Sequence, residues 1–106
     1  MSAIAELNDR FRKGDMSLGQ YRLTLGVQEL EPEKRQQLIQ LVRDFDSFNP
    51  DNDPVGERDF GKVALDDENY FFKIDYYDPT LNHHSQDPAS VYATRRVMTL
   101  MCSDEY

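Results

Sequence analysis

The chain has very little cysteine, no tryptophan and no long apolar run, and these shortages exclude several classes of protein. Cys102 is the only cysteine among 106 residues. No disulfide can therefore form within the chain, and a zinc cage built on several cysteines is impossible. Residues 1–13 mix charged and short apolar side chains and lack the apolar core of a signal peptide. No stretch approaches the length of a membrane-spanning helix. We therefore expect a cytoplasmic protein that does not bind membranes.

What is present is enough for one folded unit. A chain of 106 residues can form one domain but is too short for two. Hydrophobic residues make up 39% of it, with six phenylalanines and six tyrosines, which argues against disorder along the whole chain. The formal net charge is −8. The composition predicts a single acidic domain over residues 1–106.

The negative charge is concentrated in the middle of the chain. Between Asp44 and Asp78 there are eleven acidic residues and three basic ones, so this segment accounts for the whole net charge of −8. Such a field repels the phosphates of DNA and RNA and attracts basic proteins or cations. The alternative is an acidic surface that only contacts solvent.

Periodicity and turn residues predict an α+β fold. The expected elements are helices over Ala3–Lys13 and Pro32–Phe45 and strands over Tyr21–Val27, Asp59–Leu65, Tyr70–Tyr77 and Tyr92–Cys102. The acidic tetrad 66–69 is expected to form the turn of a hairpin. The order α-β-α-β-β-β indicates two helices packed on a small antiparallel sheet. The predicted core consists of Leu7, Phe11, Leu38, Leu41, Phe45, Phe72, Ile74, Tyr76 and Val97.

The strand over Tyr70–Tyr77 carries the densest aromatic run. Alternation places Phe71 and Tyr77 on the face opposite the predicted core, together with Lys73 and Asp75. These two rings are candidates for an interface, unless helices cover both faces of the sheet. Aromatic side chains can also stack on single-stranded bases. The acidic residues around this run argue against that use, so we expect no direct contact with nucleic acid.

The polar loop that follows the second predicted helix offers a candidate cation site. Asp51, Asp53 and Gly56 occupy the first, third and sixth positions of a calcium-loop pattern. Lys62 stands at the twelfth position, where that pattern needs a glutamate, so an EF-hand is excluded. A looser site formed by Asp51, Asp53, Glu57 and Asp59 stays open. The alternative is that Asp and Asn side chains bond nearby backbone groups and brace the loop.

A second polar loop contains adjacent histidines. His83 and His84, with nearby carboxylates such as Asp78, could ligate a metal or act as an acid–base pair. Side chains of neighbouring residues alternate along a regular strand, so both histidines cannot point into one site from such a strand. The alternative is a solvated loop. Ser85 and Cys102 lack the surroundings typical of catalytic nucleophiles.

Three segments carry a resemblance to other proteins: Phe45–Gly61, Phe72–Asp78 and Thr94–Met101. Together they resemble a small bacterial family, a domain of unknown function typical of alphaproteobacterial genomes, plasmids and other mobile elements. The family more often has histidine where Arg58 stands and tryptophan where Phe72 stands, which weakens any inherited metal or acid–base role at Arg58. The resemblance names no reaction. Its mobile-element setting implies a role in host interaction or in countering host defence.

Charge and resemblance together predict an interaction protein. The expected partner is a basic nucleic-acid-binding protein or complex, such as a CRISPR effector or a restriction enzyme, whose phosphate sites the acidic side chains would occupy. The predicted binding residues are Asp46, Asp51, Asp53, Glu57, Asp59, Asp75 and Asp78. The alternatives are a small metal-dependent enzyme and a structural or dimeric regulator. The enzyme would use Asp51, Asp53, Glu57, Asp75, His83 and His84, of which Asp51, Asp53, His83 and His84 are the candidate metal ligands. No cofactor is expected.

Overall fold

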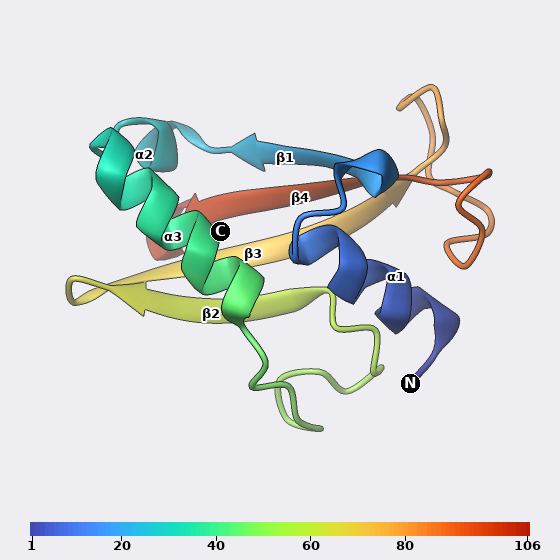
Figure 1. Ribbon diagram of the computed structural model, residues 1–106, viewed down its shortest axis with the longest axis horizontal. Helices are drawn as coiled ribbons and strands as arrows, with labels where there is room; N and C mark the ends of the chain where they lie inside the picture. Colours follow the sequence, from blue (N-terminus) through green and yellow to red (C-terminus); the bar gives the residue numbers. More distant parts are fainter.

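The computed structural model describes residues 1–106, and its elements follow the predicted order with one additional helix. All three helices lie on one face of a four-stranded sheet (Figure 1). The mixed α+β class is therefore confirmed. The elements are α1 Ala3–Arg12, β1 Gly19–Leu23, α2 Leu25–Gln28, α3 Pro32–Asp44, β2 Phe60–Leu65, β3 Glu68–Tyr77 and β4 Arg95–Cys102. Short 3-10 turns at Met16–Leu18 and Ser103–Glu105 follow α1 and β4.

The strand order of the sheet is β1-β4-β3-β2. The three strands β2, β3 and β4 pair antiparallel, but β1 pairs parallel with β4. The prediction of a purely antiparallel sheet is therefore wrong at this edge. Alternating side chains identify a strand and its two faces, but they carry no information on the direction of a partner that is distant in sequence.

The two long helices begin and end at residues whose roles the sequence indicates. The hydroxyl of Ser2 accepts a hydrogen bond from the Ala5 amide at 3.1 Å, which caps α1. Gly14 follows this helix with a φ of 122°, a conformation that favours glycine. Pro32 is the first residue of α3 and Glu33 lies in its first turn, near the positive end of the helix dipole.

Helix α2 replaces the second half of a predicted strand. The expected strand Tyr21–Val27 ends at Leu23, and Thr24 begins a single helical turn by accepting the Gln28 amide on its carbonyl at 2.9 Å. This turn places Val27 in the core with no exposed surface. Burial of Val27 therefore favours a helical turn at this position over the strand that the alternating pattern predicts.

The β2–β3 hairpin is built on two residues of the predicted acidic turn. Asp66 and Asp67 have φ values of 52° and 65°, and Leu65 pairs with Glu68 across the turn. Two consecutive left-handed residues characterise the type I′ turn, in which aspartate is well tolerated. The turn lets β3 begin at Glu68, two residues before its predicted start.

One hydrophobic cluster lies between the helices and the sheet. Of the predicted core, Leu7, Phe11, Leu38, Phe72 and Ile74 belong to its buried residues, while Phe45 and Tyr76 are half-buried and pack against it. Leu41 was wrongly placed in the core, because the buried stripe of α3 runs through Leu38 and Val42 and leaves Leu41 38% exposed. Val97 is buried, as predicted, but it lies on the opposite face of the sheet, between its register partners Gln20 and Asp75.

Gly61 allows the loop after α3 to pack against the sheet. A Cβ atom at this position would clash with the ring of Phe72 and would lie 3.0 Å from the ring of Phe45. The two rings meet edge to face, with centroids 5.3 Å apart. This contact fixes the start of the loop between α3 and β2, residues 45–59, over β2 and β3. We call this segment the acidic loop.

Candidate interaction surface

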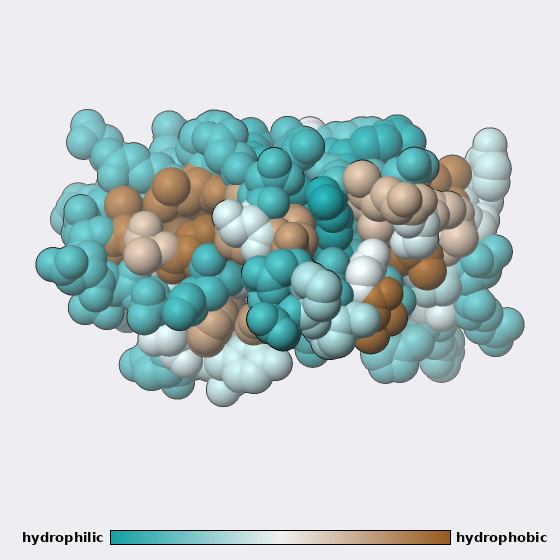
Figure 2. All heavy atoms as spheres, turned by 90° about the horizontal axis from the view of Figure 1, so that it is seen from below, coloured by the Kyte–Doolittle hydropathy of each residue, from teal (hydrophilic) through white to brown (hydrophobic).

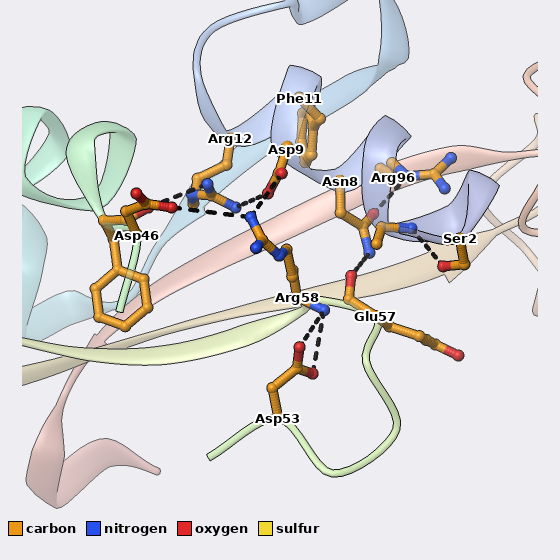
Figure 3. Close-up of polar contacts among 12 residues, drawn as sticks. Ser2, Asn8, Asp9, Phe11, Arg12, Asp46, Asp53, Glu57, Arg58 and Arg96 are labelled. Carbon is orange, nitrogen blue, oxygen red and sulfur yellow. Dashed lines mark hydrogen bonds and ion pairs between the residues drawn. The ribbon is translucent and has the colours of Figure 1, made fainter. Parts of the chain in front are cut away.

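A fully buried asparagine, Asn8, joins α1 to the sheet and to the acidic loop. Its Nδ2 donates to the carbonyl oxygen of Glu57 at 2.9 Å and to the hydroxyl of Tyr76 at 2.8 Å. Its Oδ1 accepts from Nε of Arg96 at 2.7 Å (Figure 3). A buried amide is costly unless its donors and acceptors are paired. Asn8 therefore fixes where the acidic loop meets the end of the sheet.

The next residue, Asp9, binds two arginines. Its Oδ1 accepts from Nη1 of Arg12 at 3.0 Å, and its Oδ2 accepts from Nη1 of Arg58 at 3.0 Å (Figure 3). Arg12 is fully buried and also donates to the carbonyl of Phe45 at 3.2 Å. Each guanidinium lies 5.1 Å from the ring centre of Phe48, within the range of a cation–π interaction. The Asp9 carboxylate and the Phe48 ring thus hold both guanidinium groups against the start of the loop.

A second polar contact lies beneath α1. The hydroxyl of Tyr76 donates to Oε1 of Glu57 at 2.8 Å, and burial raises the pKa of Tyr76. The guanidinium of Arg96 lies 5.3 Å from the Tyr76 ring and donates to the Pro88 carbonyl at 2.6 Å. Nη1 of Arg96 is buried without a partner, and burial lowers the pKa of this arginine. The cluster is a packed junction, and no surface cleft includes these residues.

The acidic loop is braced by its own side chains. Oδ1 of Asn49 accepts from the amides of Asp51 and Asn52 at 2.9 and 3.1 Å. Both carboxylate oxygens of Asp53 accept the Arg58 amide, at 3.1 and 3.2 Å (Figure 3). Gly56 and Arg58 both have positive φ, 78° and 57°, so the loop turns sharply before β2. This is the Asx-turn bracing that we set against a cation site.

The predicted acidic residues divide into two groups. Asp53 braces the loop, Glu57 accepts from Tyr76, and Asp75 lies 3.5 Å from Nζ of Lys73. Asp46 and Asp51 are exposed, and neither carboxylate accepts a hydrogen bond. The side chain of Asp46 is 83% exposed, with only a 3.9 Å contact to Nη1 of Arg58.

Asp59 is the one predicted residue with a raised carboxyl pKa. Burial is the main cause, and the nearby carboxylates of Glu57, Asp53 and Asp75 act in the same direction. Its carbonyl accepts the Ile74 amide at 2.7 Å, which continues the β2–β3 ladder by one residue. The fold therefore gathers acidic side chains from the loop and from β3 at this end of the sheet.

The loop between β3 and β4 holds the remaining candidates. Oδ1 of Asp78 accepts from the hydroxyl of Thr80 at 2.8 Å, and this bond is the main reason that the pKa of Asp78 is lowered. His83 and His84 are both exposed. The ring of His84 stacks on Tyr77, with centroids 5.7 Å apart. His84 thus contacts an aromatic ring that sequence analysis proposed for an interface.

The predicted metal ligands Asp51, Asp53, His83 and His84 do not form a group of three donors. The one such group is Cys102, Asp104 and Glu105, whose donor atoms lie within 4.8 Å of one another. Glu105 is already engaged, because its carboxylate accepts from the Thr24 hydroxyl at 2.6 Å and from the Gly26 and Cys102 amides. Burial raises the pKa of the Cys102 thiol to about 11, so at neutral pH it is a poor ligand and a poor nucleophile.

The surface clefts lie mostly along α3. The cleft with the largest volume, about 480 Å³, is open to solvent. It is lined by side chains of both charges, Lys13 and Arg43 together with Asp44 and Asp46. A smaller one, of about 320 Å³, lies where Leu41 of α3 meets Leu65 of β2. Figure 2 shows hydrophobic residues in separate patches on a largely hydrophilic surface. No helix has the length and apolar character needed to cross a bilayer.

Fold and site together define a small α+β domain in which a buried polar junction supports an acidic loop. The chain belongs to the family of proteins of unknown function DUF3768, whose model matches residues 23–105. The match begins at the last residue of β1, so it contains the acidic loop and β2–β4 but not α1. No curated protein and no solved structure matches the chain.

Sequence analysis missed the buried polar residues that position the loop. Asn8, Arg12 and Arg96 have no exposed surface, yet polar residues in an amphipathic helix or strand are normally assigned to the solvent side. One signal was available for Asn8, because it lies three residues before Phe11, on the apolar side of α1. For Arg96 the signal was its place in the strand, two residues before Met98 and four before Leu100, because alternation puts all three side chains on the same face.

Proposed function

We propose that this protein is a protein-interaction module that binds a basic, nucleic-acid-handling partner through its acidic loop. The observation that supports the proposal is that the carboxylates of the loop have two different roles. Asp53 and Glu57 hold the loop in one conformation, while Asp46 and Asp51 project from it without accepting a hydrogen bond. A surface that is ordered before binding loses less conformational entropy when a partner docks.

The chemistry of the exposed residues defines the partner. Carboxylates on a rigid loop can pair with lysine and arginine side chains that otherwise hold phosphates. The net charge of −8 adds long-range attraction toward a basic surface. Because the attraction is between exposed charges, binding should weaken as salt concentration rises.

The biological class of partner follows from the mobile-element setting implied by the resemblance described above. A mobile element benefits from a protein that blocks host enzymes which cut foreign nucleic acid. We therefore place the partner among host defence complexes, CRISPR effectors or restriction enzymes, and assign the protein a role as an inhibitor. Its carboxylates would occupy the basic nucleic-acid channel of such a complex.

The test compares two variants of equal charge. The first removes three exposed acids at the end of α3 and in the loop, through Asp44→Asn, Asp46→Asn and Asp51→Asn. The control removes three exposed acids near the start of α3, through Glu29→Gln, Glu31→Gln and Glu33→Gln. Both variants and the wild type are used to capture proteins from a bacterial extract at low and high salt, with and without added double-stranded DNA.

The expected result is a nucleic-acid-binding protein that the wild type and the control capture at low salt. Added DNA should compete for it, and the loop variant should lose it. Recovery of no such protein by the wild type contradicts the proposal. Equal capture by the loop variant and the wild type also contradicts it, because the bound surface then lies elsewhere. Circular dichroism melting of all three proteins separates loss of binding from loss of fold.

A further inference from the structure

The sheet face turned away from the helices has a charge opposite to that of the whole chain. We call it the outer sheet face. Strand alternation and the register place four cationic side chains on it, one from each strand, and one carboxylate, Asp75. The cations are Arg22, Lys62, Lys73 and Arg95. This face therefore carries an excess of three positive charges in a chain whose net charge is −8.

Aromatic rings lie among these cations. Phe60 and Phe71 stack with centroids 5.3 Å apart and planes at 29°, and Tyr106 meets both edge to face, at 5.5 and 5.4 Å. In the β2–β3 register, Lys62 pairs with Phe71 and Lys73 pairs with Phe60. Each ring of the stacked pair thus has an amine on the neighbouring strand, and Tyr106 is 72% exposed.

We propose that the outer sheet face binds single-stranded nucleic acid. Unpaired bases stack on exposed aromatic rings, and lysine and arginine beside the rings pair with the phosphates that link the bases. Both groups are present on this face, where Tyr106 is exposed and Phe60 and Phe71 are half-buried, and the cations are spread over all four strands. A duplex is not expected to bind in this way, because its bases are already stacked inside the helix. The proposal is independent of the partner proposed for the acidic loop.

Most of the acidic residues around the aromatic run lie away from this face. They surround the run in the sequence, but the fold sends most of them to loops and turns. Asp75 is the one carboxylate side chain on the strand positions of the outer sheet face, and it lies 3.5 Å from Nζ of Lys73. Repulsion by more distant acids is damped over about 8 Å at physiological salt. The remaining acids should slow association more than they weaken the local contacts.

The experiment measures fluorescence anisotropy of labelled oligothymidylate and oligouridylate of about ten nucleotides, a length within the usual site size. The wild type should bind at least one of them saturably. The slope of log affinity against log salt should be about −2, since three cations remain free of Asp75. In NMR titrations the shifted amides should belong to the four strands. Failure to bind either strand, or shifts confined to the acidic loop, overturns the proposal.

Matched variants separate this face from general charge effects. The triple variant Arg22→Gln, Lys62→Gln and Arg95→Gln should lose affinity by about tenfold or more, because three phosphate contacts disappear. The control removes three cations on the helix side, the exposed Arg10 and Lys13 and the half-buried Lys34, and changes the net charge equally. It should stay within about twofold of the wild type, since it leaves those contacts intact. Equal losses in both variants overturn the proposal.

The aromatic contribution is tested with Phe71→Leu, which keeps an apolar side chain but removes the stacking ring. Affinity should fall by at least about fivefold, the lower end of the range for one base–ring stack. Tyr92→Leu is the control, because Tyr92 is 91% exposed on the loop before β4. Tighter binding of an oligoglutamate peptide than of either nucleic acid overturns the proposal. So does concentration-dependent dimerisation that masks the same strand amides.

Discussion

Asp9 and Arg58 form an ion pair of 3.0 Å that joins the last turns of α1 to the end of the acidic loop. The same carboxylate binds Arg12, also at 3.0 Å, and Arg12 has no exposed surface. Arg58 has a φ of 57°, a left-handed conformation that is strained for a residue other than glycine. The loop therefore depends on α1, which supplies the only carboxylate within 3.5 Å of either guanidinium group.

Replacing the two partners of this pair should have unequal effects. Asp9→Asn leaves the buried Arg12 without its counter-charge and should cost about 3–5 kcal/mol of unfolding free energy. Arg58→Ala removes a side chain that is 27% exposed and leaves Asp9 paired with Arg12, so the expected cost is about 1–2 kcal/mol. Urea denaturation of both variants measures the difference. A larger loss for Arg58→Ala would show that Arg12 does not depend on Asp9.

Gly61 should tolerate no side chain. A Cβ atom there clashes with the Phe72 ring, so Gly61→Ala should destabilise the protein by about 1–3 kcal/mol, as overpacked cores do. Ala64→Val is the control, since Ala64 is exposed on the same strand and gains β-propensity. In the Gly61→Ala background, Phe72→Leu should recover part of the loss. If Gly61→Ala is neutral in thermal melting, the Phe72 ring does not pack against Gly61 as the structure shows.

The fold was largely predictable because long periodic segments encode it. Both long helices, the β2–β3 hairpin and most of the core follow from residues such as Leu38 and Ile74. The direction of β1 was not predictable, since its partner β4 lies at the far end of the chain. Helix α2 was not predictable either. It is a helical turn of four residues that places Val27 in the core.

The candidate site was predictable in composition but not in arrangement. The sequence shows that the loop is acidic, yet it does not show that Asp53 is committed to the Arg58 amide while Asp51 is exposed. That distinction depends on backbone angles within the loop. The positive charge of the outer sheet face was not predictable either. Its cations come from four strands and lie on one surface only when the sheet forms.

Glu105 should contribute stability that depends on pH. Hydrogen bonds from the Thr24 hydroxyl, then from the Gly26 and Cys102 amides, lower the pKa of Glu105 from 4.5 to about 2. Because the folded-state pKa is depressed, the contribution is complete above 4.5 and is lost as pH falls toward 2. Glu105→Gln should therefore melt earlier than the wild type near neutral pH, with a gap that closes in acid.

The control for this contact is Asp104→Asn, because Asp104 is exposed and its carboxylate accepts no hydrogen bond. It should leave the melting temperature nearly unchanged over the same pH range. Hydrogen exchange supplies a local readout, since loss of the carboxylate should speed exchange at the Gly26 amide. A gap between Glu105→Gln and the wild type that is constant with pH would contradict a role for the ionised carboxylate.

Asp59 should have the opposite effect on stability. Burial, aided by the carboxylates of Glu57, Asp53 and Asp75, raises the pKa of Asp59 above 3.8. A carboxyl group with a raised folded-state pKa binds its proton more tightly in the folded protein, so its ionisation at neutral pH destabilises the fold. Asp59→Asn should therefore be more stable than the wild type at neutral pH. The advantage should shrink as pH falls through the raised pKa and should vanish below 3.8, where the carboxyl is protonated in both states.

Urea denaturation of Asp59→Asn at several pH values measures this advantage, with the exposed Asp51→Asn as control. The control should show a much smaller change, because Asp51 is not buried. An Asp59→Asn variant that is less stable at neutral pH, or whose advantage grows in acid, would contradict the assignment. If the advantage is found and the same variant binds a basic partner less well, Asp59 exchanges stability for binding, as residues of functional surfaces often do. Unchanged binding would instead remove Asp59 from the interaction surface and leave Asp46 and Asp51 as its acidic contacts.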